Sequence, residues 1–130
     1  MRILVVDDNE YVRRGVVNLI QSEPSWIVCG EATNGEDALK QSRDLLPDLI
    51  LLDVSMPGMD GLEVARLLRR LTPSARILIM SQNDPDRLRP GAIRAGAADC
   101  VDKSHLGTEL IPRIQRILKT SELHDLEQHG

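Results

Sequence analysis

The stretch LILLD (residues 49–53) decides the fold, because four consecutive apolar residues in it end on a carboxylate. A continuous apolar run of this length is typical of a strand that is buried on both faces of a parallel sheet. Similar runs occupy residues 3–6, 26–29 and 77–80, and residues 99–102 form a weaker fifth candidate. The chain is therefore predicted to contain five short strands.

Helices are expected in the segments between these runs, where apolar residues recur every three or four positions and share one helix face. These residues are Val12, Val16, Leu19 and Ile20, then Leu62, Ala65, Leu68 and Leu71, and finally Leu110, Ile111, Ile114, Ile117 and Leu118. Asn34 is expected to open another helix and Ser104 to cap the last one. Two prolines should close helices and two should shorten or break the fourth helix, namely Pro47 and Pro73, and Pro85 and Pro90.

Strands and helices that alternate five times predict an open α/β fold, in which a doubly wound parallel sheet carries helices on both faces. The chain has 130 residues and is 42% hydrophobic, which is enough for one domain with a real core. The domain is expected to span residues 1–120, with residues 121–130 as a polar tail or the start of a linker.

Composition narrows the classes of function. Aromatic residues make up only 2% of the chain and its net charge is -4, which together argue against direct binding of nucleic acid. Cys29 and Cys100 stand outside any CxxC cluster, so a zinc site is not indicated and reduced, cytoplasmic residence is expected. The first apolar run is too short for a signal peptide or a membrane span, so no membrane association is expected.

Polar residues fall where the predicted strands end. Asp7 and Asp8 follow the first run, Asp53 follows the third, Ser81 follows the fourth, and Lys103 follows the fifth. The carboxyl ends of parallel strands share one edge of the sheet, and ligands bind in the crevice outside that edge. Three carboxylates, a hydroxyl and an ammonium are therefore expected to meet in space.

Such a cluster needs a counter-charge, since two carboxylates about 4 Å apart repel by about 4 kcal/mol at an effective dielectric near 20. A magnesium ion removes that penalty, because it prefers a few carboxylates together with water and phosphate oxygens. An Asp beside the ion is a competent nucleophile towards a phosphoryl donor, which makes Asp53 the candidate. Lys103 and Ser81 can then bind the phosphoryl oxygens. Each of these residues alone could be an ordinary turn, cap or surface residue. All of them together, in this order at the ends of the predicted strands, are improbable by chance.

At this point the chain resembles the bacterial response-regulator receiver domains of two-component systems over roughly residues 1 to 120. The resemblance rests on a loop, an acidic pair, a switch hydroxyl and a motif that leads to a lysine, which are residues 53–61, Asp7-Asp8, Ser81, and Gly96-Ala97 before Lys103. It implies a flavodoxin-like sheet of order 2-1-3-4-5 with five helices. It also implies that Asp53 is the phosphoacceptor.

The resemblance further implies a magnesium site. Asp8, Asp53 and the backbone carbonyl of Ser55 would be direct ligands, and Asp7 would act through water. The phosphoryl donor would be a phosphohistidine on a sensor histidine kinase. The chain would transfer this group to itself and lose it slowly, with no turnover of a separate substrate.

Residues 8–15 and 30–35 look most like receivers that precede a LuxR-type helix-turn-helix. The 130 residues contain no such DNA-binding domain. The chain is therefore expected either to belong to a longer regulator that contacts DNA through an output domain, or to act through protein contacts. A homodimer that forms on phosphorylation is one expected partner state.

One position departs from the family pattern, since Cys100 stands where receivers usually carry a Tyr or Phe that rotates in concert with the switch hydroxyl. This leaves room for a degenerate receiver that acts as a constitutive interaction module. A second alternative is a magnesium-dependent phosphatase that uses Asp as its nucleophile. Such enzymes usually have a second Asp two residues later, where this chain has Ser55, so turnover of phosphate esters is not expected. A third alternative is a flavin or nucleotide carrier of the same topology. It is not favoured, because no Gly-rich loop follows the first strand and aromatic residues are scarce.

Overall fold

The computed structural model describes residues 1–58, 60–82 and 84–129, with side chains described as far as residue 120. Five parallel strands form one sheet of order β2-β1-β3-β4-β5. The strands are β1 (Arg2–Val6), β2 (Ile27–Ala32), β3 (Leu49–Asp53), β4 (Arg76–Ser81) and β5 (Asp99–Asp102). The helices are α1 (Glu10–Gln21), α2 (Gly35–Leu45), α3 (Gly61–Leu71), α4 (Pro85–Arg94) and α5 (Leu106–His129), with a 3-10 turn at Lys103–His105. The predicted fold, strand order and number of helices are confirmed.

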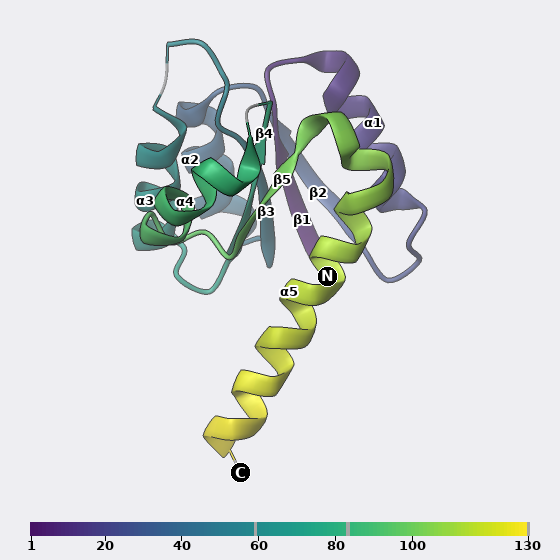
Figure 1. Cartoon of the computed structure of the whole chain (residues 1–130), viewed down its shortest axis with the longest axis vertical. Helices are drawn as coiled ribbons and strands as arrows, with labels where there is room; N and C mark the ends of the chain where they lie inside the picture. The colour runs from purple at the N-terminus through teal and green to yellow at the C-terminus, as the bar shows by residue number, and fades with distance from the viewer. Residues whose placement is uncertain (59, 83, 130) are drawn as a thin grey trace.

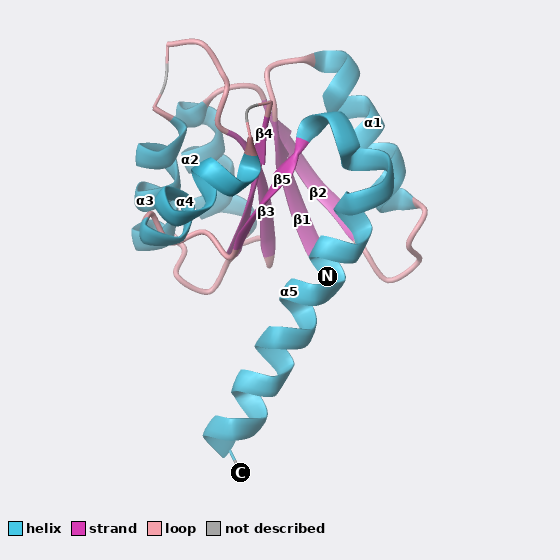
Figure 2. Cartoon of the chain, viewed as in Figure 1, coloured by secondary structure: helices cyan, strands magenta, loops and turns pink. Residues whose placement is uncertain are grey.

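Helices cover the sheet on both sides, with α1 and α5 on one face and α2, α3 and α4 on the other (Figures 1 and 2). The third strand shows why its sequence is apolar throughout. Ile50 and Leu52 point into the core under α2, α3 and α4, whereas Leu49 and Leu51 point into the core under α1 and α5. Because both faces are covered, period-two alternation is lost, as expected for a central parallel strand.

The second strand differs from the expectation of burial on both faces. It begins at Ile27 rather than at Trp26, and it lies at the edge of the sheet, where it pairs only with β1. Ile27 is 58% exposed, while Trp26 lies before the strand with its side chain in the core beside α1 and α5. The apolar run 26–29 therefore combines one core residue with an edge strand.

Helix ends agree with the sequence at Asn34, whose side chain accepts a hydrogen bond from the Asp37 N–H at 2.8 Å and caps α2. The prediction for Ser104 is wrong. Asp102 is the capping residue there, because its Oδ1 accepts hydrogen bonds from both the backbone N–H and the hydroxyl of Ser104. Asp102 caps the 3-10 turn that precedes α5, and Ser104 lies inside that turn as a donor to Asp102 rather than as a cap.

The prolines act as expected in two of the three helices concerned. Helices α2 and α3 end at Leu45 and Leu71, two residues before Pro47 and Pro73. The fourth helix is not broken, however. Pro85 occupies its first turn, where a missing N–H costs nothing, and the helix continues through Pro90 to Arg94.

The last helix, α5, runs from Leu106 to His129 and extends away from the sheet (Figure 1). The expected boundary at residue 120 falls inside this helix and stays a prediction. No helix in the described part of the chain combines the length and the apolar character that crossing a membrane requires.

Candidate functional site

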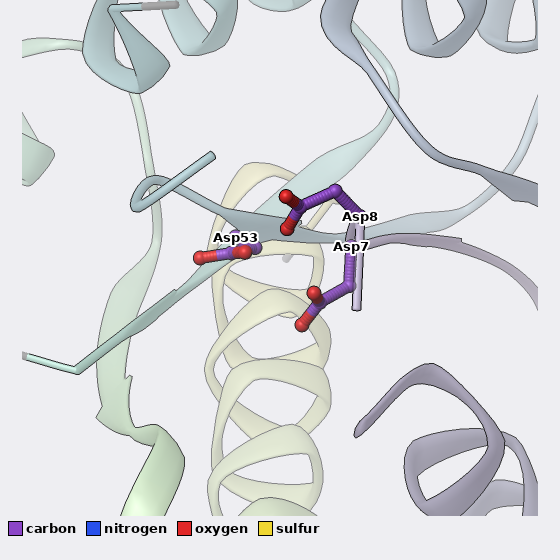
Figure 3. A group of neighbouring side chains, drawn as sticks. All are labelled: Asp7, Asp8 and Asp53. Carbon is purple, nitrogen blue, oxygen red and sulfur yellow. The ribbon is translucent and has the colours of Figure 1, made fainter. Parts of the chain in front are cut away.

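The three carboxylates predicted from the sequence lie together at the carboxyl edge of the sheet. Asp7 and Asp8 follow β1, Asp53 ends β3, and these two strands are neighbours with Val6 opposite Leu52. One oxygen from each carboxylate lies within 4.8 Å of the others, and Figure 3 shows the three side chains converging. Asp7 and Asp53 are buried and Asp8 is exposed, so the cluster opens to solvent on the side of Asp8.

Lys103 joins the cluster from the end of β5. Its Nζ lies 3.1 Å from Asp53 Oδ2 and 2.9 Å from Asp7 Oδ2, and its side chain is only 6% exposed. The expected contact with Asp53 is present, and the contact with Asp7 is an addition that the sequence did not predict. Two buried carboxylates therefore share one ammonium, whose single charge cannot neutralise both.

The ionisation of the pair reflects this geometry. Burial raises the pKa of Asp7 above its usual value, aided by the charge of Asp53 and opposed by Lys103. Burial would lower the pKa of Lys103, but the hydrogen bond and charge of Asp7, with the charge of Asp53, outweigh it and raise that pKa. The ammonium of Lys103 therefore stays protonated. Its one charge only partly compensates the two buried carboxylates, Asp7 and Asp53.

The loop after Asp53 orients that residue. Asp53 Oδ1 accepts hydrogen bonds from the Ser55 N–H at 2.8 Å and from the Ser55 hydroxyl at 2.5 Å. Only the backbone carbonyl of Ser55 was expected to take part, although an Asp side chain commonly accepts from the backbone N–H two residues later in a turn. Both oxygens of Asp53 therefore have partners, one in its own loop and one in Lys103.

The same loop packs closely against the start of α3. A Cβ on Gly61 would lie 2.5 Å from the Cα of Val54, so only glycine fits at this position. Asp60 caps α3 by accepting hydrogen bonds from the N–H groups of Leu62 and Glu63. This close approach holds the loop over the carboxyl edge of the sheet.

Ser81 ends β4 and is 1% exposed. With Ser55, Asp60 and Gly61 it lines a cavity of about 200 Å³ that opens between the loop and the start of α4. The predicted hydroxyl is therefore at the expected edge, beside the loop that carries Asp53.

The donor set fits a magnesium ion. All the available groups are oxygens, which hard divalent cations prefer, and the exposed side of the cluster leaves room for water and phosphate oxygens. The buried Asp7 Oδ2 lies 2.9 Å from the ammonium of Lys103, which it shares with Asp53. A cation near Asp7 and Asp53 would relieve that incomplete compensation.

A family model described as the response regulator receiver domain matches residues 3–115. The chain belongs to this receiver family. Receivers are the signalling domains of two-component systems. This receiver is 35% identical to the response regulator GacA of Pseudomonas aeruginosa over 117 residues, which are 90% of this chain and 55% of that protein. It thus spans about half the length of the GacA proteins that it matches.

Solved structures place the receiver in the same family. It is 35% identical to a LuxR-family two-component response regulator from Aurantimonas sp. SI85-9A1, with a TM-score of 0.85 over 92% of this chain and 85% of that one. It is 36% identical to the signal receiver domain of the response regulator NarL from Mycobacterium tuberculosis, with a TM-score of 0.82 over 91% and 95% of the two chains. The similarity to LuxR-type receivers expected from the sequence is confirmed.

Cys100 lies in β5 of this receiver and is fully buried among the side chains under α2, α3 and α4. Burial raises the pKa of its thiol to about 11, so the group is a neutral thiol at physiological pH. Cys29 is half-buried, and both cysteines are free. The Cys100 side chain, which is smaller than the usual Tyr or Phe, therefore packs as a core residue, as expected for an unreactive thiol.

Asp99 of β5 is paired with two arginines, Arg89 and Arg113, a contact that the sequence did not predict. Asp99 Oδ1 accepts from Arg89 Nε of α4 at 3.0 Å, and Asp99 Oδ2 accepts from Arg113 of α5 at 2.9 Å. Arg89 also donates to the backbone carbonyl of Cys100 at 3.2 Å. Asp99 therefore links helices on opposite faces of the sheet, a contact that no local pattern predicts.

Proposed function

We propose that this receiver accepts a phosphoryl group on Asp53 from a phosphohistidine of a sensor histidine kinase, with magnesium bound. The meeting of Asp7, Asp8 and Asp53, two of which pair with the ammonium of Lys103, is the observation that supports it best. It combines a nucleophilic carboxylate, acidic groups that can bind a metal ion, and the ammonium of Lys103 for the incoming phosphoryl oxygens.

In the proposed transfer, an oxygen of Asp53 attacks phosphorus while the phosphorus–nitrogen bond to the histidine breaks. The electron pair of that bond leaves with the imidazole, so the phosphoryl group ends as an acyl phosphate. When bound, magnesium would supply positive charge to offset that on the phosphoryl oxygens. Asp8, Asp53 and the backbone carbonyl of Ser55 would hold it directly, and Asp7 would do so through water.

The resting contacts of Asp53 must change for this to happen. Its Oδ1 is held by the N–H and hydroxyl of Ser55, and its Oδ2 by Lys103. We expect Lys103 to move from the carboxylate to a phosphoryl oxygen, and the hydroxyl of Ser81 to bind another. Displacement of Ser81 and Lys103 would carry the signal from the site to the rest of the fold.

We further propose that the receiver is a switch and not an enzyme that turns over a separate substrate. Magnesium phosphatases usually have a second Asp two positions after the nucleophile. Here that residue is Ser55, whose hydroxyl donates a hydrogen bond to Asp53 and lacks the carboxyl group that would act as general acid and base. Cytoplasmic residence, a homodimer on phosphorylation and DNA contact only through an output domain belong to the same proposal. They follow from the family and from the likeness to GacA and to LuxR-type regulators.

Incubation with acetyl phosphate and magnesium, followed by intact-mass spectrometry, tests the site. The wild type should gain one phosphoryl group and Asp53→Asn should gain none. Asp60→Asn is the matched control, because Asp60 is a carboxylate of the same loop that caps α3, and Asn is an equally good cap. It should be labelled like the wild type. A wild type that accepts no phosphoryl group from acetyl phosphate or from a histidine kinase would favour a constitutive interaction module.

A further inference from the structure

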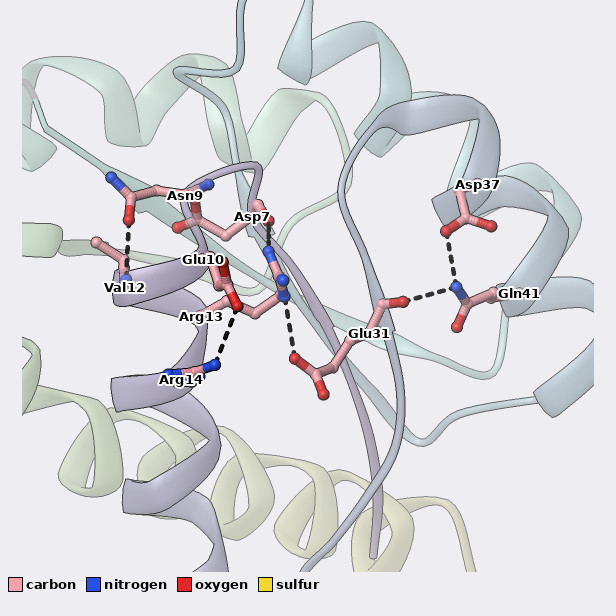
Figure 4. Close-up of polar contacts among 9 residues, drawn as sticks. All are labelled: Asp7, Asn9, Glu10, Val12, Arg13, Arg14, Glu31, Asp37 and Gln41. Carbon is pink, nitrogen blue, oxygen red and sulfur yellow. Dashed lines mark hydrogen bonds and ion pairs between the residues drawn. The ribbon is translucent and has the colours of Figure 1, made fainter.

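Arg13 of α1 reaches the backbone of the acidic pair and also contacts Glu31 of β2 (Figure 4). Its Nη1 donates to the backbone carbonyl of Asp7 at 2.9 Å, and its Nε donates to Glu31 Oε1 of β2 at 3.0 Å. The Arg13 side chain is only 16% exposed, whereas Arg14 beside it is 77% exposed and pairs with Glu10 in its own helix. Arg13 thus differs from an ordinary surface arginine in burial and in what it contacts.

The contact completes the fixing of Asp7. The Asp7 N–H donates to the Ala32 carbonyl at 3.0 Å, the Asp7 carbonyl accepts from Arg13, and Asp7 Oδ1 accepts from the Asn9 N–H at 2.9 Å. The peptide unit between Asp7 and Asp8 carries the carbonyl that Arg13 holds. Asp8 is exposed, and the orientation of this peptide is one constraint on where its carboxylate lies.

Glu31 is itself held in place. It lies opposite Val5 in the β1–β2 ladder, and its backbone carbonyl accepts from Gln41 Nε2 at 2.7 Å. Gln41 in turn donates to Asp37 at 2.8 Å (Figure 4). The support for Arg13 therefore runs from α2 through β2, which is the edge strand that carries none of the predicted site residues.

We propose that Arg13, oriented by Glu31, is a positioning residue that sets the Asp7–Asp8 peptide for magnesium binding. The proposal rests on the proposed function, since it concerns the same metal site. The planar guanidinium donates to a carboxylate and to a carbonyl at once in a fixed geometry, which the single ammonium of a lysine does not reproduce. Groups that orient metal ligands in this way commonly change metal affinity when they are removed.

The test is a magnesium titration of the metal-free full chain, followed by amide chemical shifts of Asp8 and Asp53, with thermal midpoints measured in parallel. Arg13→Met should weaken magnesium binding by about tenfold. Arg14→Met, the matched control, should bind as the wild type does. Arg13→Lys keeps the charge without the double contact and should stay weakened. Glu31→Gln keeps an acceptor for Arg13 and should bind better than Glu31→Ala.

Each other outcome bears on the proposal. Magnesium affinity that is unchanged in Arg13→Met, with or without a lower thermal midpoint, would mean a structural role only and would overturn it. Full recovery in Arg13→Lys would show that charge matters and position does not. If Arg13→Met does not fold, the two Glu31 variants decide. If the wild type neither binds magnesium nor accepts the phosphoryl group, both the proposed function and this inference are wrong. If the wild type does both and Arg13→Met binds magnesium equally well, only this inference is wrong.

Discussion

Replacing Lys103 with Met removes one charge from the carboxylate cluster while keeping a side chain of similar length. Lys103 is 6% exposed and lies within 3.1 Å of two buried carboxylates, so the variant leaves both without their cation. Removing one partner of a buried ion pair typically costs about 3–5 kcal/mol. For a domain of this size, such a loss should lower the thermal midpoint by about 10 °C or more.

Magnesium should reverse much of this loss, because a divalent cation bound by Asp8 and Asp53 supplies the missing positive charge and stabilises the folded state by mass action. The assay compares thermal midpoints, followed by circular dichroism, in a metal chelator and in saturating magnesium. Lys40→Met is the control, since Lys40 is an exposed residue of α2, and it should change neither midpoint. If Lys103→Met were as stable as the wild type without metal, or equally destabilised with and without magnesium, Lys103 would not be the neutralising charge of this site.

Three further predictions concern the metal, the sheet edge and the signal. Asp8→Ala should abolish the rise in thermal midpoint that magnesium causes in the wild type, because a direct ligand is lost; an undiminished rise would place the ion elsewhere. Burial alone would raise the pKa of Asp99, but hydrogen bonds from the Cys100 N–H, Arg113 and Arg89 outweigh it and lower that pKa below 3.8. Its stabilising effect is therefore present above that pH and lost as the pH falls through the folded-state value, so Asp99→Asn should lower the thermal midpoint at neutral pH but not in strong acid. An equal deficit at every pH would mean that the charge of Asp99 is not responsible. Beryllium fluoride, a mimic of the phosphoryl group, should shift amide signals strongly near Asp53 and Ser81 and only slightly beyond Cys100, and Cys100→Tyr should enlarge the distal shifts if the fully buried site can house the ring. Large distal shifts in the wild type, no smaller than in that variant, would show that the aromatic ring is dispensable.

The meeting of Asp7, Asp8, Asp53 and Lys103 could be predicted from the sequence for a simple geometric reason. The three carboxylates follow runs of apolar residues and Lys103 follows the weaker fifth candidate strand. Such runs form buried parallel strands, and the carboxyl ends of parallel strands lie along one edge. The order of the strands does not follow from these patterns and came from the resemblance to receivers. Given that order, the neighbourhood of β1 and β3 brings the acidic residues within reach of one ion.

Tertiary structure alone decided which partners the polar groups take. Ile27 is exposed because β2 lies at the sheet edge, and nothing in the run 26–29 distinguishes an edge strand from a central one. Arg13 and Glu31 are 18 positions apart, and only the pairing of β1 with β2 brings them together. Lys103 likewise contacts Asp7 as well as Asp53 because three strand ends converge on it. Local patterns report burial and period, whereas the choice of a charged partner depends on distances that exist only once the sheet has formed.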